Sequence, residues 1–213
     1  MKKKWIIFDV MGVIFKVGDD TNDLLVPYIQ TIDANESSEK INEVYMEASL
    51  GKITSCEFWK QLNCATDSTY KEIEKKYLDE CLTLDEKFIE VASRLKENYN
   101  LAILSNDISE WSAYLREKHG INELVEFSVI SGDVGYRKPS EEIYKLALEK
   151  VNVDPCDCVF VDDRDKNLKP ALQLGMKVIQ FLRDDIECSI DKVITVKSFT
   201  ELDEQIINLW QDK

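Results

Sequence analysis

Short apolar runs alternate with stretches of helical periodicity through most of this chain. The runs are too short for helices and predict buried strands; they cover residues 5–8, 101–104, 127–130, 158–161 and 178–182. Helical patterns lie between and after them, at residues 85–97, 109–120, 139–150, 167–174 and from 198 onward. A further strand is predicted at residues 192–196. Alternation of this kind predicts an α/β fold, a Rossmann-like parallel sheet with helices on both faces.

Residues 16–88 interrupt this alternation, because their pattern is helical and contains no strand signal. The helical stretches fall at residues 22–29, 38–49, 54–62 and 68–82. Thr54 and Glu57 have the spacing of a capping box, which marks the start of the third stretch. We therefore predict a helical bundle inserted after the first strand, with a core domain formed by residues 1–15 and 89–213 and a helical cap formed by residues 16–88.

Composition and charge narrow the classes of partner. The chain has 213 residues, of which 44% are hydrophobic, and a formal net charge of −14. The hydrophobic content suffices for a packed core. The negative charge argues against nucleic acid and anionic membrane surfaces as partners, because both require a basic footprint. No segment is long and apolar enough to predict a membrane-spanning helix.

The start of the chain superficially resembles a signal peptide, but Asp9 interrupts the apolar run and no small-residue cleavage site follows. Six cysteines without disulfide-framework spacing indicate reduced thiols and a cytoplasmic protein. Cys156 and Cys158 form one close pair, but no second pair or nearby histidine supports metal or redox chemistry there. The single histidine, His119, is expected at a helix end, where a cation is favoured.

Acidic side chains follow two of the predicted strands. Asp9 ends the first strand, with Gly12 in the turn after it, and Asp162 and Asp163 follow the strand at 158–161. Each acid alone is explained by a helix cap or a solvated turn. Together at one sheet edge they repel, at a cost of roughly 4 kcal/mol per pair about 4 Å apart at an effective dielectric of about 20. The protein must protonate one acid or bind a cation, and Mg²⁺ suits carboxylate ligands and a substrate phosphate.

Two further segments carry groups that suit a phosphate. Ser105 and Asn106 follow the strand at 101–104, which places a hydroxyl and an amide at the same sheet edge as Asp9. Lys138 precedes a predicted helix, where an ammonium would neutralise charge on a transferred phosphoryl group. An ordinary turn and a solvated lysine are the alternatives for these segments taken singly.

The four segments, in this order and strand context, resemble the haloacid-dehalogenase-like (HAD) hydrolase superfamily over essentially the whole chain. The matching stretches are Phe8-Asp9-Val10-Met11-Gly12-Val13, Leu104-Ser105-Asn106, Arg137-Lys138-Pro139 and Val161-Asp162-Asp163 with Asn167. The stretch from Asp162 to Ala171 is similar to the phosphatase domain of soluble epoxide hydrolases. The helical insertion resembles the cap of the helical-cap subgroup.

The resemblance implies a role for each matched residue. Asp9 would be the nucleophile that forms an aspartyl-phosphate, and also a Mg²⁺ ligand. The remaining ligands would be the Met11 carbonyl, Asp163 directly, and Asp162 through water. Ser105, Asn106 and Lys138 would hold the phosphoryl group, Asn167 would orient the fourth motif, and Gly12 would allow the turn. Covalent catalysis with a metal and a lysine fits the physics of phosphoryl transfer.

One position departs from the family pattern. Most phosphatases of this superfamily have a second aspartate two residues after the nucleophile, where this chain has Met11. A thioether cannot serve as acid or base, and such help is worth about 10²–10⁴-fold. A slow phosphatase, a substrate with a good leaving group, or a substitute acid is therefore expected. Asp107, Asp19 and Asp20 are the candidate substitutes.

The function predicted is Mg²⁺-dependent hydrolysis of a small phosphorylated metabolite. Two alternatives stay open: dehalogenation or phosphonate cleavage, the latter requiring a cap lysine such as Lys16 or Lys52, and a catalytically weak protein that binds a phosphorylated ligand or has a regulatory role. Dehalogenases need no metal, which leaves the acids at 162–163 unexplained. The cap aromatics Tyr45, Phe58 and Trp59 are expected in the core. The sequence indicates neither the specific substrate nor the oligomeric state.

Overall fold

The computed structural model describes residues 3–17, 19–183, 190 and 193–210. Its single sheet is parallel throughout, with strand order β3-β2-β1-β4-β5-β6. The strands are β1 (Trp5–Phe8), β2 (Asn100–Ser105), β3 (Phe127–Ile130), β4 (Cys158–Asp162), β5 (Lys177–Phe181) and β6 (Ile194–Val196). The order reverses direction at β1, which places β1 and its neighbours β2 and β4 at the switch point where open α/β sheets bind ligands.

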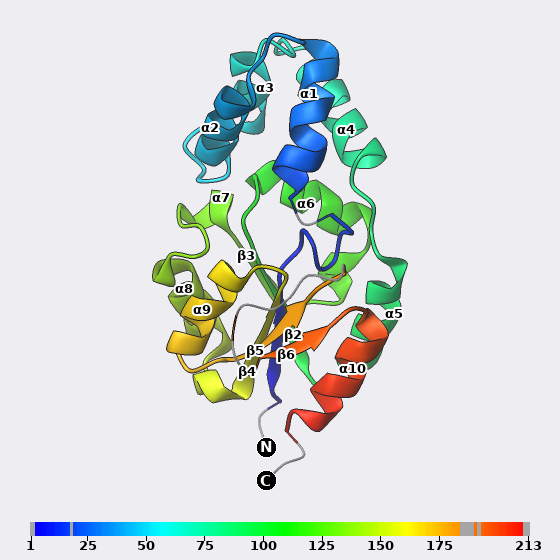
Figure 1. Ribbon diagram of the computed structural model, residues 1–213, viewed down its shortest axis with the longest axis vertical. Helices are drawn as coiled ribbons and strands as arrows, with labels where there is room; N and C mark the ends of the chain where they lie inside the picture. The colour runs from blue at the N-terminus through cyan, green and yellow to red at the C-terminus, as the bar shows by residue number, and fades with distance from the viewer. Residues whose placement is uncertain (1–2, 18, 184–189, 191–192, 211–213) are drawn as a thin grey trace.

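Helices cover both faces of the sheet (Figure 1). Alternate side chains of β1 pack on opposite faces of the sheet. Ile6 and Phe8 belong to the hydrophobic cluster on the face covered by α5 (Glu86–Leu95) and α10 (Phe199–Asn208). Trp5 and Ile7 belong to the cluster on the face covered by α8 (Glu141–Val151) and α9 (Asp165–Gln173). Successive side chains of a strand point to opposite faces, so a continuous apolar run suits a strand buried on both sides. The predicted fold class is therefore confirmed.

Four helices between β1 and β2 lie together at one end of the molecule (Figure 1). They are α1 (Val26–Ile32), α2 (Ser38–Ala48), α3 (Ser55–Gln61) and α4 (Tyr70–Glu80), and a π-helical turn, η1 (Thr21–Leu25), leads into them. We call residues 21–80 the helical segment. The capping box predicted at Thr54 and Glu57 is present at the start of α3. The division into a core and a cap with boundaries at 15/16 and 88/89 stays a prediction.

An aromatic cluster joins the helical segment to the sheet domain. Trp111 on α6 (Ser109–Lys118) lies 5.7 Å from Trp59 and 5.3 Å from Phe58 and Tyr77, measured between ring centroids. Glu74 on α4 accepts hydrogen bonds from the indole nitrogens of Trp59, at 3.1 Å, and Trp111, at 2.6 Å. One continuous hydrophobic core therefore runs from the sheet face into the helical segment.

The predicted elements agree with the structure within a few residues. Helix α9 begins at Asp165, two residues before the predicted start at Asn167, which places Asn167 in its first turn. The short α7 (Ser131–Val134), the π-helical turn and the turns η2 (Ile121–Glu123) and η3 (Pro155–Asp157) were not predicted. Lys192 of the last predicted strand and Cys188 lie outside the described residues. Across the described ranges, no helix combines the length and apolarity that crossing a bilayer requires.

Candidate active site

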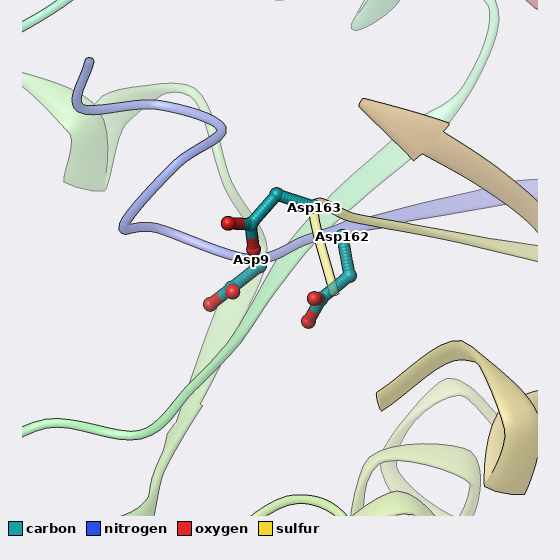
Figure 2. Close-up of side chains that lie close together, drawn as sticks. All are labelled: Asp9, Asp162 and Asp163. Carbon is teal, nitrogen blue, oxygen red and sulfur yellow. The ribbon is translucent and has the colours of Figure 1, made fainter. Parts of the chain in front are cut away.

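The three predicted strand-end acids meet at one point of the sheet edge. Phe8 pairs with Val161, and the Asp9 amide donates to the Val161 carbonyl at 2.8 Å. This register places Asp9 beside Asp162 and Asp163, and one carboxylate oxygen from each of the three lies within 4.8 Å of the others. Figure 2 shows the three side chains converging from the two strand ends. Residues about 150 positions apart in sequence are adjacent here because parallel strands end at a common edge.

A buried lysine lies between two of these acids. The Lys138 ammonium is 2.7 Å from Asp9 Oδ1 and 2.7 Å from Asp162 Oδ2, and the residue is 4% exposed. It reaches this position from the segment between α7 and α8. With all groups ionised, three carboxylates and one ammonium leave an excess of two negative charges in a buried space. A divalent cation would balance that excess.

Burial dominates the ionisation of the acids. It raises the pKa of Asp9 to about 7; attraction to Lys138 opposes the rise and repulsion from Asp162 adds to it. Burial followed by repulsion from Asp162 and Asp9 raises the pKa of Asp163 to about 8. Burial lowers the pKa of Lys138, but Asp162 and Asp9 outweigh that effect, so its pKa is raised and the side chain is an ammonium at neutral pH. Without a metal, the cluster therefore holds protons that the bound cation would displace.

Asp162 and Asp163 have different surroundings. Asp162 accepts hydrogen bonds from Asn167 Nδ2, at 3.0 Å to each oxygen, and from the Arg164 amide at 2.8 Å. Asp163 Oδ1, in contrast, is buried and has no hydrogen-bond partner among the described residues. An unpartnered buried carboxylate oxygen beside two more carboxylates suits an oxygen-ligated cation such as Mg²⁺. The residues present therefore fit a metal, with Asp163 the better placed of the two to contact it directly.

Gly12 is required by its contact with Asp163. Its φ is +83°, a conformation that glycine adopts without strain, and a Cβ at this position would collide with the Asp163 carboxylate. The turn after β1 thus passes against the acid from β4. The sequence indicated only a turn at this position, and the structure adds the close approach.

Ser105 and Asn106 lie at the end of β2, next to β1 as predicted. Ser105 is 1% exposed, and its hydroxyl has no hydrogen-bond partner in the described part of the chain. Asn106 instead binds the backbone of Lys138: its Oδ1 accepts from the Lys138 amide at 2.7 Å, and its Nδ2 donates to the Lys138 carbonyl at 3.0 Å. The Asn106 side chain thereby fixes the segment that delivers the lysine.

A cavity of about 210 Å³ opens beside this cluster. Asp9, Met11, Asn106 and Lys138 line it from the sheet domain, and the other lining residues are Asp20, Thr21, Tyr45, Met46, Arg137, Pro139, Arg164, Lys166 and Asn167. Its lining therefore comes from both the strand ends and the helical segment.

Six lining residues have no predicted role. Arg137 and Pro139 adjoin Lys138 in sequence, and Arg164 and Lys166 adjoin Asp163 and Asn167; that adjacency was the available signal. Thr21 and Met46 carried no signal. Tyr45 is buried, as predicted, but it also lines the cavity, because the apolar face of α2 continues to the cavity wall.

Several other candidates lie away from the cavity. His119 ends α6 as predicted and packs edge-on against Phe15, with ring centroids 5.5 Å apart. Asp107 is 1% exposed and is not part of the cavity lining. Cys156 is exposed and Cys158 is buried, and both are free thiols. These positions support the alternatives that give the histidine and the cysteine pair no catalytic role.

Comparison with known proteins agrees with this fold. Residues 3–175 match the family described as haloacid dehalogenase-like hydrolase, and the chain belongs to that family. Structures of a HAD family enzyme from Bacteroides thetaiotaomicron superpose with TM-scores of 0.74 and 0.72 at 19% and 20% identity, covering 90% of this chain and 97% and 98% of theirs. The second of these holds magnesium and inorganic phosphate.

Two curated relatives are similar in sequence. D-ribitol-5-phosphate phosphatase of Bacteroides thetaiotaomicron is 26% identical over 187 residues, which cover 83% of this chain and 91% of that protein. Bifunctional epoxide hydrolase 2 of Rattus norvegicus is 39% identical over 59 residues, which cover 28% of this chain and 11% of that protein.

Proposed function

We propose that this chain is a Mg²⁺-dependent phosphatase that hydrolyses a small phosphorylated molecule through a phosphoaspartate on Asp9. The observation that carries the proposal is the convergence of three carboxylates, two buried and one partly buried, with an excess of two negative charges when all are ionised and an unpartnered oxygen on Asp163. Without a bound cation, such repulsion is relieved only by protonating the acids. The phosphatase named among the relatives adds support from an independent source.

Each site residue has a task in this mechanism. Asp9, Asp163 and the Met11 carbonyl would hold the ion, and Asp162 would act through a bound water, because its oxygens already serve Lys138, Asn167 and the Arg164 amide. The ion would supply positive charge that offsets the charge of the phosphoryl oxygens and of the acids.

The chain's own groups carry out the transfer. The Asp9 carboxylate attacks phosphorus and the bond to the leaving oxygen breaks; water then attacks the phosphoaspartate and releases inorganic phosphate. The Lys138 ammonium, fixed by two acids and by Asn106, stabilises the transferred group, and the unpartnered Ser105 hydroxyl donates to one of its oxygens. Preorganised donors of this kind need no rearrangement as charge develops.

The size and position of the cavity support a small substrate. A space of about 210 Å³ accommodates a phosphoryl group and a short carbon chain, but not a macromolecule. Because Thr21, Tyr45 and Met46 line it, we infer that the helical segment forms part of a cap, within the proposed residues 16–88, that selects the substrate.

Turnover of p-nitrophenyl phosphate tests the proposal. We expect activity that requires Mg²⁺, is abolished by EDTA, and falls by about 10⁴-fold or more in Asp9→Asn, since removal of a covalent nucleophile leaves little catalysis. Asp67→Asn is the matched control, because Asp67 makes a surface ion pair with Lys60 and its side chain is 80% exposed. Turnover that is unaffected by EDTA, or by Asp9→Asn, would contradict the proposal.

The binding-protein alternative has one observation in its favour, the Met11 side chain on the cavity wall where a second acid is usual in the family. It predicts saturable binding of inorganic phosphate with Mg²⁺ and no turnover of any member of a phosphorylated-metabolite panel that includes D-ribitol 5-phosphate. The same panel identifies the substrate class if turnover is found.

A further inference from the structure

A second carboxylate faces the cavity from the helical side. Asp20 lines the same cavity as Asp9 and Met11, and it is only 9% exposed. Asp9 reaches the cavity from the end of β1 and Asp20 reaches it from the residue just before the helical segment, so a substrate in the cavity contacts both. Met11, in the position where family members carry an acid, also lines the cavity and offers only a thioether.

The Asp20 side chain lines the cavity and does not cap a helix. Asp20 directly precedes η1, yet its side chain makes no capping hydrogen bond to that turn. The capping role belongs to Asp19, which accepts from the Asn22 amide at 3.3 Å and from Asn22 Nδ2 at 3.0 Å and whose side chain is 48% exposed. Two adjacent aspartates therefore differ in function: one satisfies the turn and the other faces the cavity. Single π-helical turns such as η1 are often found at functional sites.

The groups around Asp20 keep its proton exchangeable near neutral pH. Burial raises the pKa of Asp20 to about 6; Arg164 opposes this, Asp19 adds to it, and Arg137 opposes it. Asp107 also faces it, with a pKa raised by burial and by repulsion from Asp20.

Two tyrosines complete these surroundings. Burial raises the pKa of the Tyr45 and Tyr77 hydroxyls, and Asp20 adds to that rise, so both stay neutral. A carboxyl group that titrates close to the working pH can give up a proton and take it back within one turnover.

We propose that Asp20 is the acid–base catalyst of the reaction, a role that rests on the phosphatase function proposed above. In the first step the Asp9 carboxylate forms a bond to phosphorus, the bond from phosphorus to the leaving oxygen breaks, and the Asp20 carboxyl gives its proton to that oxygen. In the second step the Asp20 carboxylate takes a proton from water as the water oxygen bonds to phosphorus. The bond from phosphorus to Asp9 breaks, and inorganic phosphate leaves. Asp20 is then protonated and Asp9 ionised, as at the start.

Asp107, the other buried acid near this point, does not fit the same task. Its Oδ1 accepts from the Ile108 amide at 2.8 Å, and the residue is not part of the cavity wall. A substrate in the cavity reaches Asp20, which lines it, whereas Asp107 is 1% exposed and is not among the lining residues.

Two aryl phosphates of similar shape separate acid catalysis from binding. Phenol is a poorer leaving group than p-nitrophenol and gains more from protonation. We expect Asp20→Asn to lower kcat/KM for phenyl phosphate by about 10²-fold or more, and for p-nitrophenyl phosphate by less than about 10-fold. The wild-type kcat/KM for phenyl phosphate should fall as the pH rises above the pKa of Asp20, and this decline should be absent in Asp20→Asn. Asp20→Glu, which keeps the carboxyl group, should retain the decline.

Asp19→Asn is the matched control, because it makes the same chemical change one residue away and should leave the ratio between the two substrates unchanged. An equal loss on both substrates in Asp20→Asn, or an unaltered pH profile, would overturn the role of Asp20 while leaving the phosphatase in place. No wild-type turnover of either substrate would overturn the phosphatase itself and this role with it.

Discussion

Two groups of carboxylates are enclosed in or near the cavity wall, and they are stabilised in different ways. In the strand-end cluster of Asp9, Asp162 and Asp163, the ammonium of Lys138 lies between Asp9 and Asp162, at 2.7 Å from an oxygen of each. We call Asp20 and Asp107 the inner pair. Burial is the largest influence on the pKa of each, and nearby arginines lower these pKa values by less than burial raises them.

Burial does not distinguish the two groups, because it raises the pKa of acids in both. Among the described residues, they differ in whether a cation lies within hydrogen-bond distance of the carboxylates, as Lys138 does in the first group. Where oxygens converge on one point and a fixed cation holds two of them, a second cation completes the balance. Where no ammonium or guanidinium is hydrogen-bonded to the buried oxygens, a proton is the more favourable counterion. The first arrangement suits a metal and the second suits proton transfer. Three substitutions test that distinction.

Lys138→Met should have the largest effect. It removes the hydrogen-bonded cation from the strand-end cluster and leaves buried acids without it, which should reduce the free energy of unfolding by about 3–5 kcal/mol at neutral pH. The loss should shrink at lower pH as Asp9 takes up a proton. Activity on p-nitrophenyl phosphate should fall by about 10²–10³-fold. Urea unfolding and steady-state kinetics measure the two effects.

Lys145→Met is the control for this change, because Lys145 pairs with Glu141 at 2.8 Å on the surface, where both side chains are about half exposed. Such a pair is worth about 0–1 kcal/mol. Equal effects of the two substitutions would show that the central lysine is not the counterion of the cluster.

Asp163→Asn should abolish most of the stabilisation by Mg²⁺. In the wild-type protein, Mg²⁺ at about 100 times its Kd should add about 2.7 kcal/mol to the free energy of unfolding. The variant loses the carboxylate oxygen best placed to bind the ion, but it also loses the repulsion of Asp163 from Asp162 and Asp9. It should therefore be at least as stable as wild type in EDTA at about pH 8, and less stable in Mg²⁺.

Thermal unfolding with and without Mg²⁺ measures this, with Asp67→Asn as the control that keeps the full Mg²⁺ effect. A variant that is destabilised in EDTA and retains the wild-type Mg²⁺ shift would contradict a metal role for Asp163.

Asp107→Asn should have the smallest effect at about pH 5, of about 1 kcal/mol, and the effect should change with pH. The folded-state pKa of Asp107 is raised by burial, so the protonated acid contributes stability that is fully present below its unfolded pKa and is lost as pH rises through its folded pKa. The variant should gain stability relative to wild type between about pH 5 and about pH 8, since the amide does not ionise. Urea unfolding at both pH values, with Asp67→Asn alongside, tests the sign. A stability difference between variant and wild type that is the same at both pH values would show that Asp107 does not carry the proton.

The fold could be predicted from sequence because every strand of the sheet's centre is a short apolar run and the connections from β1 through to β5 carry a helical period. The strand-end acids were predictable for the same reason: parallel strands bring their ends together whatever the separation in sequence. Asn167 and Gly12 followed from their neighbours in the motifs. What each of them contacts could not be deduced, because contacts depend on packing between elements.

The cavity wall was the part that the sequence left undetermined. Asp19 and Asp20 are chemically identical neighbours, and only the local turn decides which of them satisfies Asn22 and which faces the cavity. Tyr45 lies on an apolar helix face, so periodicity alone assigns it to the core. Asn106 carried the signal of a phosphate ligand, but its side chain binds backbone instead. Such differences depend on contacts between two elements, and the sequence of neither element alone reveals them.

The Glu74 carboxylate between Trp59 and Trp111 gives the molecule a built-in optical reporter. The two indoles come from α3 in the helical segment and α6 in the sheet domain, and they share one acceptor with their ring centroids 5.7 Å apart. Indole fluorescence and near-ultraviolet circular dichroism both respond to hydrogen bonding and to the mutual orientation of neighbouring rings. Any displacement of α3 against α6 would therefore change the spectrum of the unlabelled protein.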